Sequence, residues 1–235
     1  MGEIIIPQGY KSALNLHDTQ VAIKTVKDYF QHELTHRLHL LRVTAPLFVQ
    51  PETGLNDNLN GVEHPVSFEL KDQGTKKTAE IVQSLAKWKR YALHKYGFSE
   101  GEGIYTDMNA IRQDEVTDNI HSVYVDQWDW EKIMSPEERN LRGTERDTGL
   151  DFEGLDELSR YYEHVRKVYK ALKKTEKYMA IQYDYIEEIL PKDIFFITSQ
   201  ELEDRYPDLT PKEREYTITK EKGAVFIMQI GGVLA

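Results

Sequence analysis

The sequence predicts an α+β fold in which helices flank an antiparallel sheet. Three observations favour this class: strand-like segments follow one another through short turns, an amphipathic helix precedes them, and a long helix follows them. The strict alternation of strands and helices that a parallel βαβ sheet requires is missing from the pattern. The 235 residues, 40% of them hydrophobic, suit one large domain or two small ones, and we expect a single domain over 1–235.

The first 84 residues are predicted to form a helix, a strand and a β-hairpin, in this order. Apolar residues three or four positions apart predict a helix over about 19–38. A strand is expected over 40–49, where Pro46 interrupts the pattern and indicates an edge or an interface. Residues 63–84 are typical of a β-hairpin, with the turn at 72–74.

A short helix and a strand pair are expected next. Ser84 is a suitable N-cap for the segment "LAKWKRYALHKY", and Gly97 is a suitable stop. Strands are predicted around 103–112 and 121–131, and the polar segment "QDEVTDN" between them is typical of the loop in an antiparallel pair.

The second half is more helical. Capping patterns at Ser135 and Thr210 predict two helix starts, and a long helix is expected over roughly 155–180. Residues 141–154 are charged and contain three glycines, so we expect an exposed loop there. The segments "IFFITS" and "AVFIMQI" predict buried strands.

Composition and charge exclude several classes of protein. The apolar runs are too short to cross a bilayer, and the first residues lack the pattern of an export signal. The chain has no cysteine, which excludes disulfides and thiolate chemistry and favours a cytoplasmic location. A net charge of −10 and a pI near 5.3 argue against a general nucleic-acid binder.

The predicted strand over 121–131 has one unusual face. Read at period two, this face begins with valines and ends with Gln127, Asp129 and Glu131. A strand that emerges into solvent explains the change, and so does a strand that forms the floor of a polar pocket. The residues by themselves leave both explanations open.

Several charged residues suit a site for a small zwitterion. An α-amino acid presents an ammonium group, which a carboxylate binds, and a carboxylate, which Lys or Arg binds. Asp57 lies in the segment "GLNDNLNG", Lys89 and Arg90 lie in "SLAKWKRYAL", and Arg112 ends a predicted strand. Each also has a structural explanation: Asp57 as a turn residue, the basic cluster as a solvated helix face, and Arg112 as a surface ion pair with Asp114 or Glu115.

Two further observations concern cofactors. The segment "HELTH" matches the H-E-x-x-H pattern of zinc proteases, with His32 and His36 as ligands and Glu33 as base. The match is only five residues long, and the two histidines fall on the polar side of an ordinary amphipathic helix, so a zinc site is a distant alternative. Neither G-x-x-x-x-G-K nor G-x-G-x-x-G occurs, and a nucleotide would therefore be held without a glycine-rich loop.

Longer segments resemble a known family. The segments "IRQDE" and "DQWDWE" resemble motif 2 of class II aminoacyl-tRNA synthetases, and "VTAPLF" resembles motif 1, whose proline lies at a dimer interface. The segments "DNLNGVE", "SLAKWKR", "GEGIYTDMNAIR", "HSVYVDQWDWE", "SQELEDRYPDL" and "GAVFIMQIGG" together resemble the aspartate–ammonia ligases, the ammonia-dependent asparagine synthetases, across almost the whole chain.

This resemblance implies a class II synthetase-like core that works as a homodimer and uses ATP and magnesium. The implied reaction converts aspartate and ammonia to asparagine, AMP and pyrophosphate through a β-aspartyl-adenylate. The resemblance also implies that the polar end of the strand over 121–131 is the floor of an amino-acid pocket, with Tyr124, Trp128 and Trp130 packed into the opposite layer.

The resemblance also assigns roles to individual residues. Arg112 would bridge the β-carboxylate and the α-phosphate, and a fixed guanidinium there would lower the repulsion between two anions. Asp57 would take the substrate ammonium and Lys89 the α-carboxylate. His121 would reach the ATP phosphates. The pocket would be completed by Ser84, Arg90, Gln127 and Asp129.

The family pattern continues beyond the last residues of this sequence. Its acidic metal ligands and its motif 3 arginine are expected there, so no metal ligand is predicted within the chain, and we expect the 235 residues alone to be inactive or nearly so. Two alternatives remain: a synthetase-like enzyme that adenylates aspartate, and a truncated, non-catalytic chain that binds aspartate.

Overall fold

The computed structural model describes the chain except for residues 1–3, 58, 60, 72–75, 137–154 and 231–235. Its contacts divide the chain into two compact units. Unit 1 comprises 1–12 and 38–135, and unit 2 comprises 13–37 and 136–235. The expectation of a single domain over 1–235 stays a prediction. Within the described part of the chain, no helix combines the length and the apolar character that a membrane span needs.

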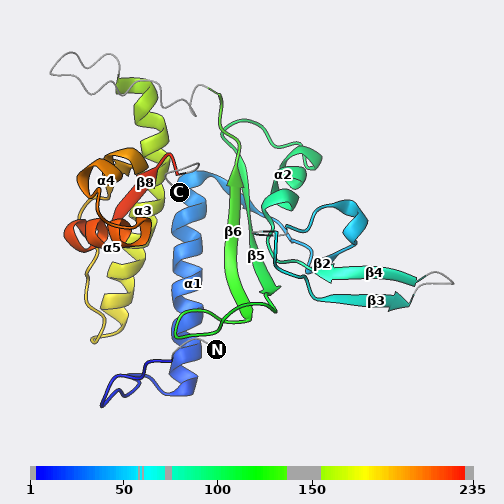
Figure 1. The fold of residues 1–235 in the computed structure, drawn as a ribbon, viewed down its shortest axis with the longest axis horizontal. Helices are drawn as coiled ribbons and strands as arrows, with labels where there is room; N and C mark the ends of the chain where they lie inside the picture. Colours follow the sequence, from blue (N-terminus) through cyan, green and yellow to red (C-terminus); the bar gives the residue numbers. More distant parts are fainter. Residues whose placement is uncertain (1–3, 58, 60, 72–75, 137–154, 231–235) are drawn as a thin grey trace. The chain divides into compact units, whose positions relative to one another are not determined.

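The central sheet of unit 1 has the strand order β1–β5–β6 (Figure 1). Strand β5 (Gly103–Ile111) pairs antiparallel with β6 (Tyr124–Lys132), from Gly103 opposite Lys132 to Ile111 opposite Tyr124. Strand β1 (Leu40–Arg42) joins the other edge of β5 in parallel. The predicted antiparallel pair is therefore confirmed, and the parallel strand β1 extends it.

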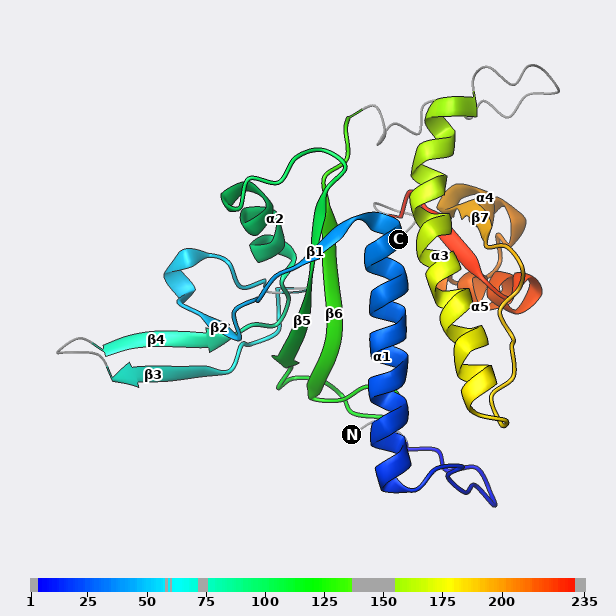
Figure 2. The same cartoon turned by 180° about the vertical axis from the view of Figure 1, so that it is seen from behind.

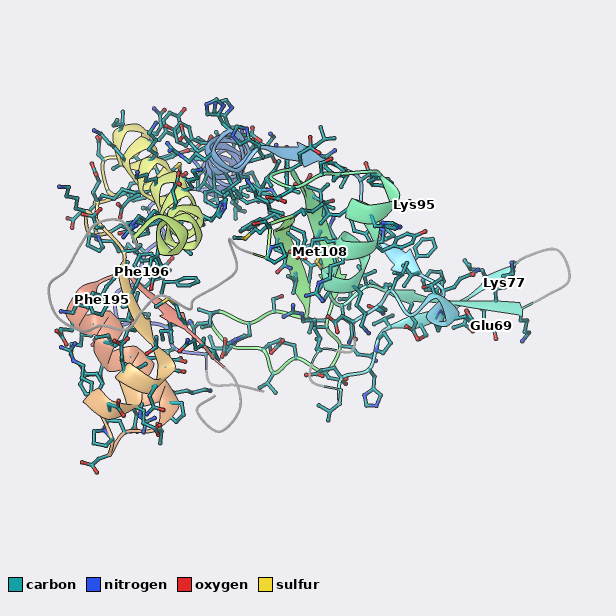
Figure 3. The ribbon with its side chains drawn as sticks, turned by 90° about the horizontal axis from the view of Figure 1, so that it is seen from above. Glu69, Lys77, Lys95, Met108, Phe195 and Phe196 are labelled. Atoms are coloured by element: carbon teal, nitrogen blue, oxygen red, sulfur yellow. The ribbon has the colours of Figure 1, made fainter. Side chains whose placement is uncertain are left out.

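One face of this sheet is covered by helix α2 (Ala86–Lys95), which Figure 2 shows beside β5 and β6 from the opposite side. Ile104 and Met108 of β5 lie at most 1% exposed against Trp88 and Leu93 of the helix. Figure 3 shows Met108 within this layer and Lys95 at the end of the helix. The apolar face of the ten-residue helix α2 thus covers one face of the sheet, to which β6 also contributes side chains.

The ends of α2 correct one expectation and agree with another. The N-cap is Leu85 rather than Ser84, which stands one position earlier and accepts a hydrogen bond from Ala86 N at 3.2 Å. Gly97 follows the C-cap Tyr96 with φ +73°, a left-handed conformation that a helix end favours in glycine.

A second sheet of unit 1 has the order β2–β4–β3. Strands β3 (Ser67–Lys71) and β4 (Lys76–Ile81) form the predicted hairpin, along which Figure 3 labels Glu69 and Lys77, while its expected turn at 72–74 lies outside the described residues. Strand β2 (Phe48–Val49) pairs antiparallel with β4, and the 3-10 helix η1 (Pro51–Thr53) follows it. Pro46 separates β1 from β2, so the single strand predicted over 40–49 is two strands in two sheets.

Two long helices of unit 2 pack together. Helix α1 (Leu16–Leu38) and helix α3 (Leu155–Gln182) confirm the two long helices that apolar periodicity predicts. The rings of Tyr29 and Tyr178 stack with centroids 4.1 Å apart. Near them, Glu33 of α1 binds Arg37 at 2.7 Å and lies 3.6 Å from Lys174 of α3.

The rest of unit 2 is a parallel strand pair with two helices between its strands. Strands β7 (Phe195–Thr198) and β8 (Val225–Met228) pair in parallel and are connected through α4 (Ser199–Arg205) and α5 (Pro211–Lys222). Ile197, Leu202 and Ile218 form the core beneath them. Figure 3 labels Phe195 and Phe196 on β7.

The capping box at Thr210 is confirmed, and a second one at Thr198 begins α4, a helix that periodicity over so few residues does not predict. The helix start expected at Ser135 and the loop expected over 141–154 fall almost wholly outside the described residues.

Candidate functional site

The loop that carries Asp57 is attached to the second sheet by Asn56. Its Nδ2 donates to Ile81 O at 3.2 Å and to Glu80 Oε2 at 3.3 Å, and its Oδ1 accepts from Gln83 N at 2.9 Å. Lys87 Nζ of α2 donates to Asn56 O at 3.3 Å. One side chain therefore holds this loop against the end of β4 and the residues that lead into α2. Asp57, the next residue along the chain, is half-buried.

Lys89 and Asp129 meet between α2 and the sheet. Lys89 is 6% exposed; its Nζ donates to Asp129 Oδ1 and to Trp130 O at 3.0 Å, and lies 3.5 Å from Glu131 Oε2. Alternation along β6 sends Asp129 and Glu131 to the face that α2 covers. The unusual polar face of this strand is thus an inner face, and a buried ammonium group balances its carboxylates.

Arg112 follows directly on β5 and belongs to the same face. Its backbone N–H donates to Val123 O at 2.8 Å and so continues the ladder beyond Ile111. Period-two alternation aligns it with Met108 and therefore with Gln127, which stands opposite Met108 on β6. At about 3.3 Å per residue, Arg112 lies on the order of 13 Å along the strand from that pair.

Arg112 lines a cavity of about 440 Å³. The other described residues around it are Leu59, Glu63, Gln83, Asp114 and Glu115. Two polar atoms of this lining, Arg112 Nε and Gln83 Oε1, are buried and have no hydrogen-bond partner among the described residues. Buried polar atoms are nearly always paired, so a pair of exceptions at one cavity indicates a place for a polar ligand.

The charge of the cavity is mixed. Three carboxylates and one guanidinium line it, a combination that suits a ligand carrying both an ammonium group and an anion. Asp114 is held in place by His64, whose backbone N–H donates to Asp114 Oδ2 at 2.7 Å and whose Nδ1 lies 3.1 Å from the same oxygen. The backbone N–H of His64, and then its ring, hold the pKa of Asp114 below the ordinary value of 3.8. No ion pair joins Arg112 to Asp114 or Glu115 in the described structure.

The remaining predicted site residues lie apart from this cavity lining. Gln127 is half-buried and its Nε2 lies 3.3 Å from Met108 Sδ. Arg90 is exposed on α2. His121 is exposed in the turn before β6, where both its backbone N–H and its ring bind Asp118. Ser84 is half-buried next to the cavity residue Gln83.

Three aromatic residues are expected to pack into the opposite layer; Trp128 and Trp130 are half-buried, but Tyr124 is exposed, and the expectation is wrong for it. Tyr124 is 57% exposed, and its hydroxyl donates to Asn109 Oδ1 at 2.6 Å. Trp128 is half-buried and its Nε1 donates to Asp107 Oδ1 at 3.1 Å. Asp107 in turn binds Arg42 at 2.7 Å, so this face of the sheet is joined by a polar network rather than by apolar packing alone.

The "HELTH" segment lacks the features of a zinc site. His32 and His36 are exposed on α1, and no group of three or more His, Cys, Asp or Glu that could hold a metal occurs in the described part of the chain. Glu33, the required base, is paired with Arg37 and Lys174. Burial raises the pKa of Glu33, but the hydrogen bond from Arg37 and the positive charges of Lys174 and Arg37 lower it by more, so its pKa is below the ordinary 4.5.

Only Arg112 of the six described cavity residues is a predicted site residue; the others are Leu59, Glu63, Gln83, Asp114 and Glu115. Gln83 is 1% exposed and stands between Val82 and Ser84 where a strand gives way to a helix. The signal that the sequence offers for it is a polar pair, Gln83 and Ser84, between the apolar residues Val82 and Leu85. Glu63 ends the segment "DNLNGVE", which resembles the aspartate–ammonia ligases, and this resemblance is the signal that the sequence offers for it.

Comparison with known proteins supplies the context for this site. The profile of a family described as aspartate-ammonia ligase matches residues 17–235. A protein of Clostridium perfringens named aspartate–ammonia ligase is 57% identical over 235 residues, which are 100% of this chain and 65% of that protein. A protein of the same name from Clostridium tetani is 54% identical over 98% of this chain and 62% of its own length. The chain therefore spans somewhat less than two thirds of the length of these relatives.

Solved structures show a similar fold. An asparaginyl-tRNA synthetase from Entamoeba histolytica, in complex with asparaginyl-adenylate, has a TM-score of 0.51 at 14% identity, over 94% of this chain and 45% of that one. The enzyme of the same name from Pyrococcus horikoshii has a TM-score of 0.52 at 16% identity, over 89% and 45%. The fold is that of the class II aminoacyl-tRNA synthetase catalytic core, as the sequence predicts. By its family profile and its relatives, the chain belongs to the aspartate–ammonia ligase family.

Proposed function

We propose that this chain takes part in the synthesis of asparagine from aspartate, ammonia and ATP. It either carries out the reaction or forms the part of the active site that binds the amino acid. Membership of the family supports the reaction. The observation that carries the site is the buried Nε of Arg112, which has no partner in the described structure and lines a cavity together with three carboxylates. A guanidinium in that setting is ready to bind an anion.

The proposed reaction has two steps. An oxygen of the β-carboxylate of aspartate attacks the α-phosphorus of ATP, and the bond to pyrophosphate breaks. Ammonia then attacks the activated β-carbonyl carbon, the bond to the AMP oxygen breaks, and one proton leaves the nitrogen. Arg112 holds the β-carboxylate and the α-phosphate together in the first step and reduces their mutual repulsion.

The remaining proposed roles concern the amino-acid backbone of the substrate. Asp57 accepts from the ammonium group, with its loop held by Asn56. Lys89 has three N–H donors and uses two on Asp129 and Trp130 O, which leaves one for the α-carboxylate. Ser84, Arg90, Gln127 and Asp129 complete the pocket, and His121 approaches the ATP phosphates.

Magnesium, the oligomeric state and the location are proposals as well. The described residues contain no group of three or more acidic or imidazole side chains that could hold a metal ion. We propose that the ion enters with the phosphates of ATP, as is common for Mg²⁺. We also propose a homodimer and a cytoplasmic location; the resemblance to the family supports the dimer, and a chain without cysteine is compatible with a reducing compartment.

The experiment measures aspartate binding by calorimetry and AMP formation with ATP, in the presence and absence of ammonia. We expect the 235 residues alone to bind aspartate with little or no AMP formation. In a chain of the full length of the relatives, AMP should form only with ammonia, and Arg112→Met should lose at least about a hundredfold in AMP formation, as removal of one preorganised charge donor does. Dependence on tRNA instead of ammonia would favour a synthetase. Binding without AMP formation in that longer chain would favour a non-catalytic aspartate-binding protein. Absence of both would refute the proposal.

A further inference from the structure

Gln83 is the most deeply buried polar residue of the cavity lining. It is 1% exposed, and its backbone N–H donates to Asn56 Oδ1 at 2.9 Å. The bond fixes the position of its main chain between β4 and α2, while Oε1 remains buried and unpaired among the described residues. An apolar residue of similar size would fill the same space without this unsatisfied acceptor.

An unpaired, buried amide oxygen costs folding free energy unless a ligand pairs with it. Because Oε1 only accepts hydrogen bonds, the ligand atom beside it must be a donor. Arg112, which lines the same cavity, only donates and therefore meets an anion. The cavity thus offers a donor and an acceptor to one ligand, as a binding site for an amide or for a carboxylate and an amine would.

In the proposed reaction, a donor and an acceptor of hydrogen bonds are both useful beside the β-carbon of the substrate: the donor binds the β-carboxylate, and the acceptor binds the incoming nitrogen. The β-carboxylate of aspartate has no hydrogen to donate at neutral pH, whereas ammonia and the amide group of asparagine do. We propose that Gln83 Oε1 accepts a hydrogen bond from the nitrogen that attacks the β-carbonyl carbon and becomes the amide nitrogen of asparagine. This inference rests on the proposed function and adds to it the residue that binds the nitrogen.

The contact orients the nucleophile. With one N–H directed at Oε1, the lone pair of ammonia is free to face the carbonyl carbon that Arg112 holds. As the new C–N bond forms and the bond to AMP breaks, the nitrogen keeps two hydrogens, and the third proton passes to the departing phosphate oxygen. Gln83 itself neither gains nor loses a proton.

The test compares the binding of two ligands that differ only at this position. Calorimetry measures the dissociation constants of aspartate and asparagine for the purified protein and for Gln83→Met, an uncharged variant of similar length. We expect Gln83→Met to weaken asparagine binding by about five- to tenfold, the effect of one neutral hydrogen bond, and to change aspartate binding by less than about twofold.

A second variant gives the opposite signature. Gln83→Glu keeps an acceptor but adds a negative charge beside the β-carbon, so we expect it to retain asparagine binding within about threefold and to weaken aspartate binding by more than about tenfold. Gln113→Met is the matched control, because Gln113 is an exposed glutamine after β5 that does not line the cavity. Its amide donates to His64 O at 3.0 Å. It should change neither constant by more than about twofold.

The outcomes separate this inference from the proposed function. If the unaltered protein binds neither ligand, the proposed function and the inference both fail. If it binds both, and Gln83→Met and Gln83→Glu weaken the two ligands equally or not at all, the function stands and the role of Gln83 is refuted. Should Gln83→Met fail to fold in a thermal unfolding scan, the nearly isosteric Gln83→Glu decides alone. A rise in the KM for ammonia in Gln83→Met, with the KM for aspartate unchanged, would be the kinetic counterpart.

Discussion

Removal of the ammonium group of Lys89 should strongly destabilise the attachment of α2 to the sheet. In the variant Lys89→Met, Asp129 and Glu131 remain on the covered face of β6 without a cation between them, and Trp130 O loses its donor. Truncation of one partner of a buried ion pair costs about 3–5 kcal/mol. Since the side chain of Asp129 is 21% exposed, water compensates part of this loss, and we expect about 3 kcal/mol.

Asp129→Asn should cost less. Lys89 then still has Trp130 O at 3.0 Å and Glu131 at 3.5 Å, so we expect a loss of about 1–2 kcal/mol. The matched control is Lys24→Met, which removes the ammonium group of an exposed i,i+4 pair with Asp28 and should change stability by less than about 0.5 kcal/mol.

Urea unfolding followed by tryptophan fluorescence is the assay. The chain has three tryptophans, and Trp88, Trp128 and Trp130 all belong to α2 or β6, so the signal reports on this layer. A midpoint for Lys89→Met equal to that of Lys24→Met would refute the reasoning, because it would mean that the buried ammonium does not stabilise the sheet face.

Three further changes test local features of the fold. Gly103→Ala should cost about 1–3 kcal/mol in urea unfolding, since its Cβ would lie 2.5 Å from Glu131 O and 2.7 Å from Leu40 Cδ2; an unchanged midpoint would contradict that crowding. Thr198→Ala should cost about 1 kcal/mol by removing the cap of α4, whereas Thr217→Ala in the middle of α5 should be nearly neutral; equal losses would argue against the capping box. The carboxylate of Glu176 accepts hydrogen bonds from Ile189 N and Leu190 N. Burial raises the pKa of Glu176, but these bonds and Lys173 lower it more, so its pKa in the folded protein is below the ordinary 4.5. The stability that Glu176 contributes is therefore present above pH 4.5 and is lost as the pH falls through its pKa in the folded protein. Glu176→Gln should therefore flatten the decline of unfolding free energy with falling pH over about pH 5 to 3, and an unchanged slope would count against the assignment.

Much of the fold can be predicted from local patterns. The long helices α1 and α3, the β5–β6 pair and the capping box of Thr210 follow from periodicity and from side chains near in sequence. The division of the segment around Pro46 between two sheets depends on which strands pair over long distances, and no local pattern encodes that. The parallel pairing of β7 with β8 is of the same kind, because two helices separate the strands in sequence.

The candidate site is only partly encoded in local sequence. Alternation along the strand singles out Asp129, and the basic cluster singles out Lys89, but their direct pairing depends on how α2 crosses the sheet. Arg112 can be predicted from its motif and from its position at the end of a strand. The role that we propose for Gln83 rests on its burial, which the polar pair Gln83 and Ser84 between apolar neighbours indicates only weakly.

The central claim is that the β-carboxylate of aspartate is activated as an adenylate in the cavity that Arg112 lines. The test supplies a chain of the full length of the relatives with ATP, ammonia and aspartate labelled with ¹⁸O in the β-carboxylate, and then measures the mass of the AMP formed. We expect one ¹⁸O atom in each AMP, because the attack of ammonia breaks the bond between the β-carbon and the oxygen that AMP keeps. AMP without the label, or ADP in place of AMP, would contradict it.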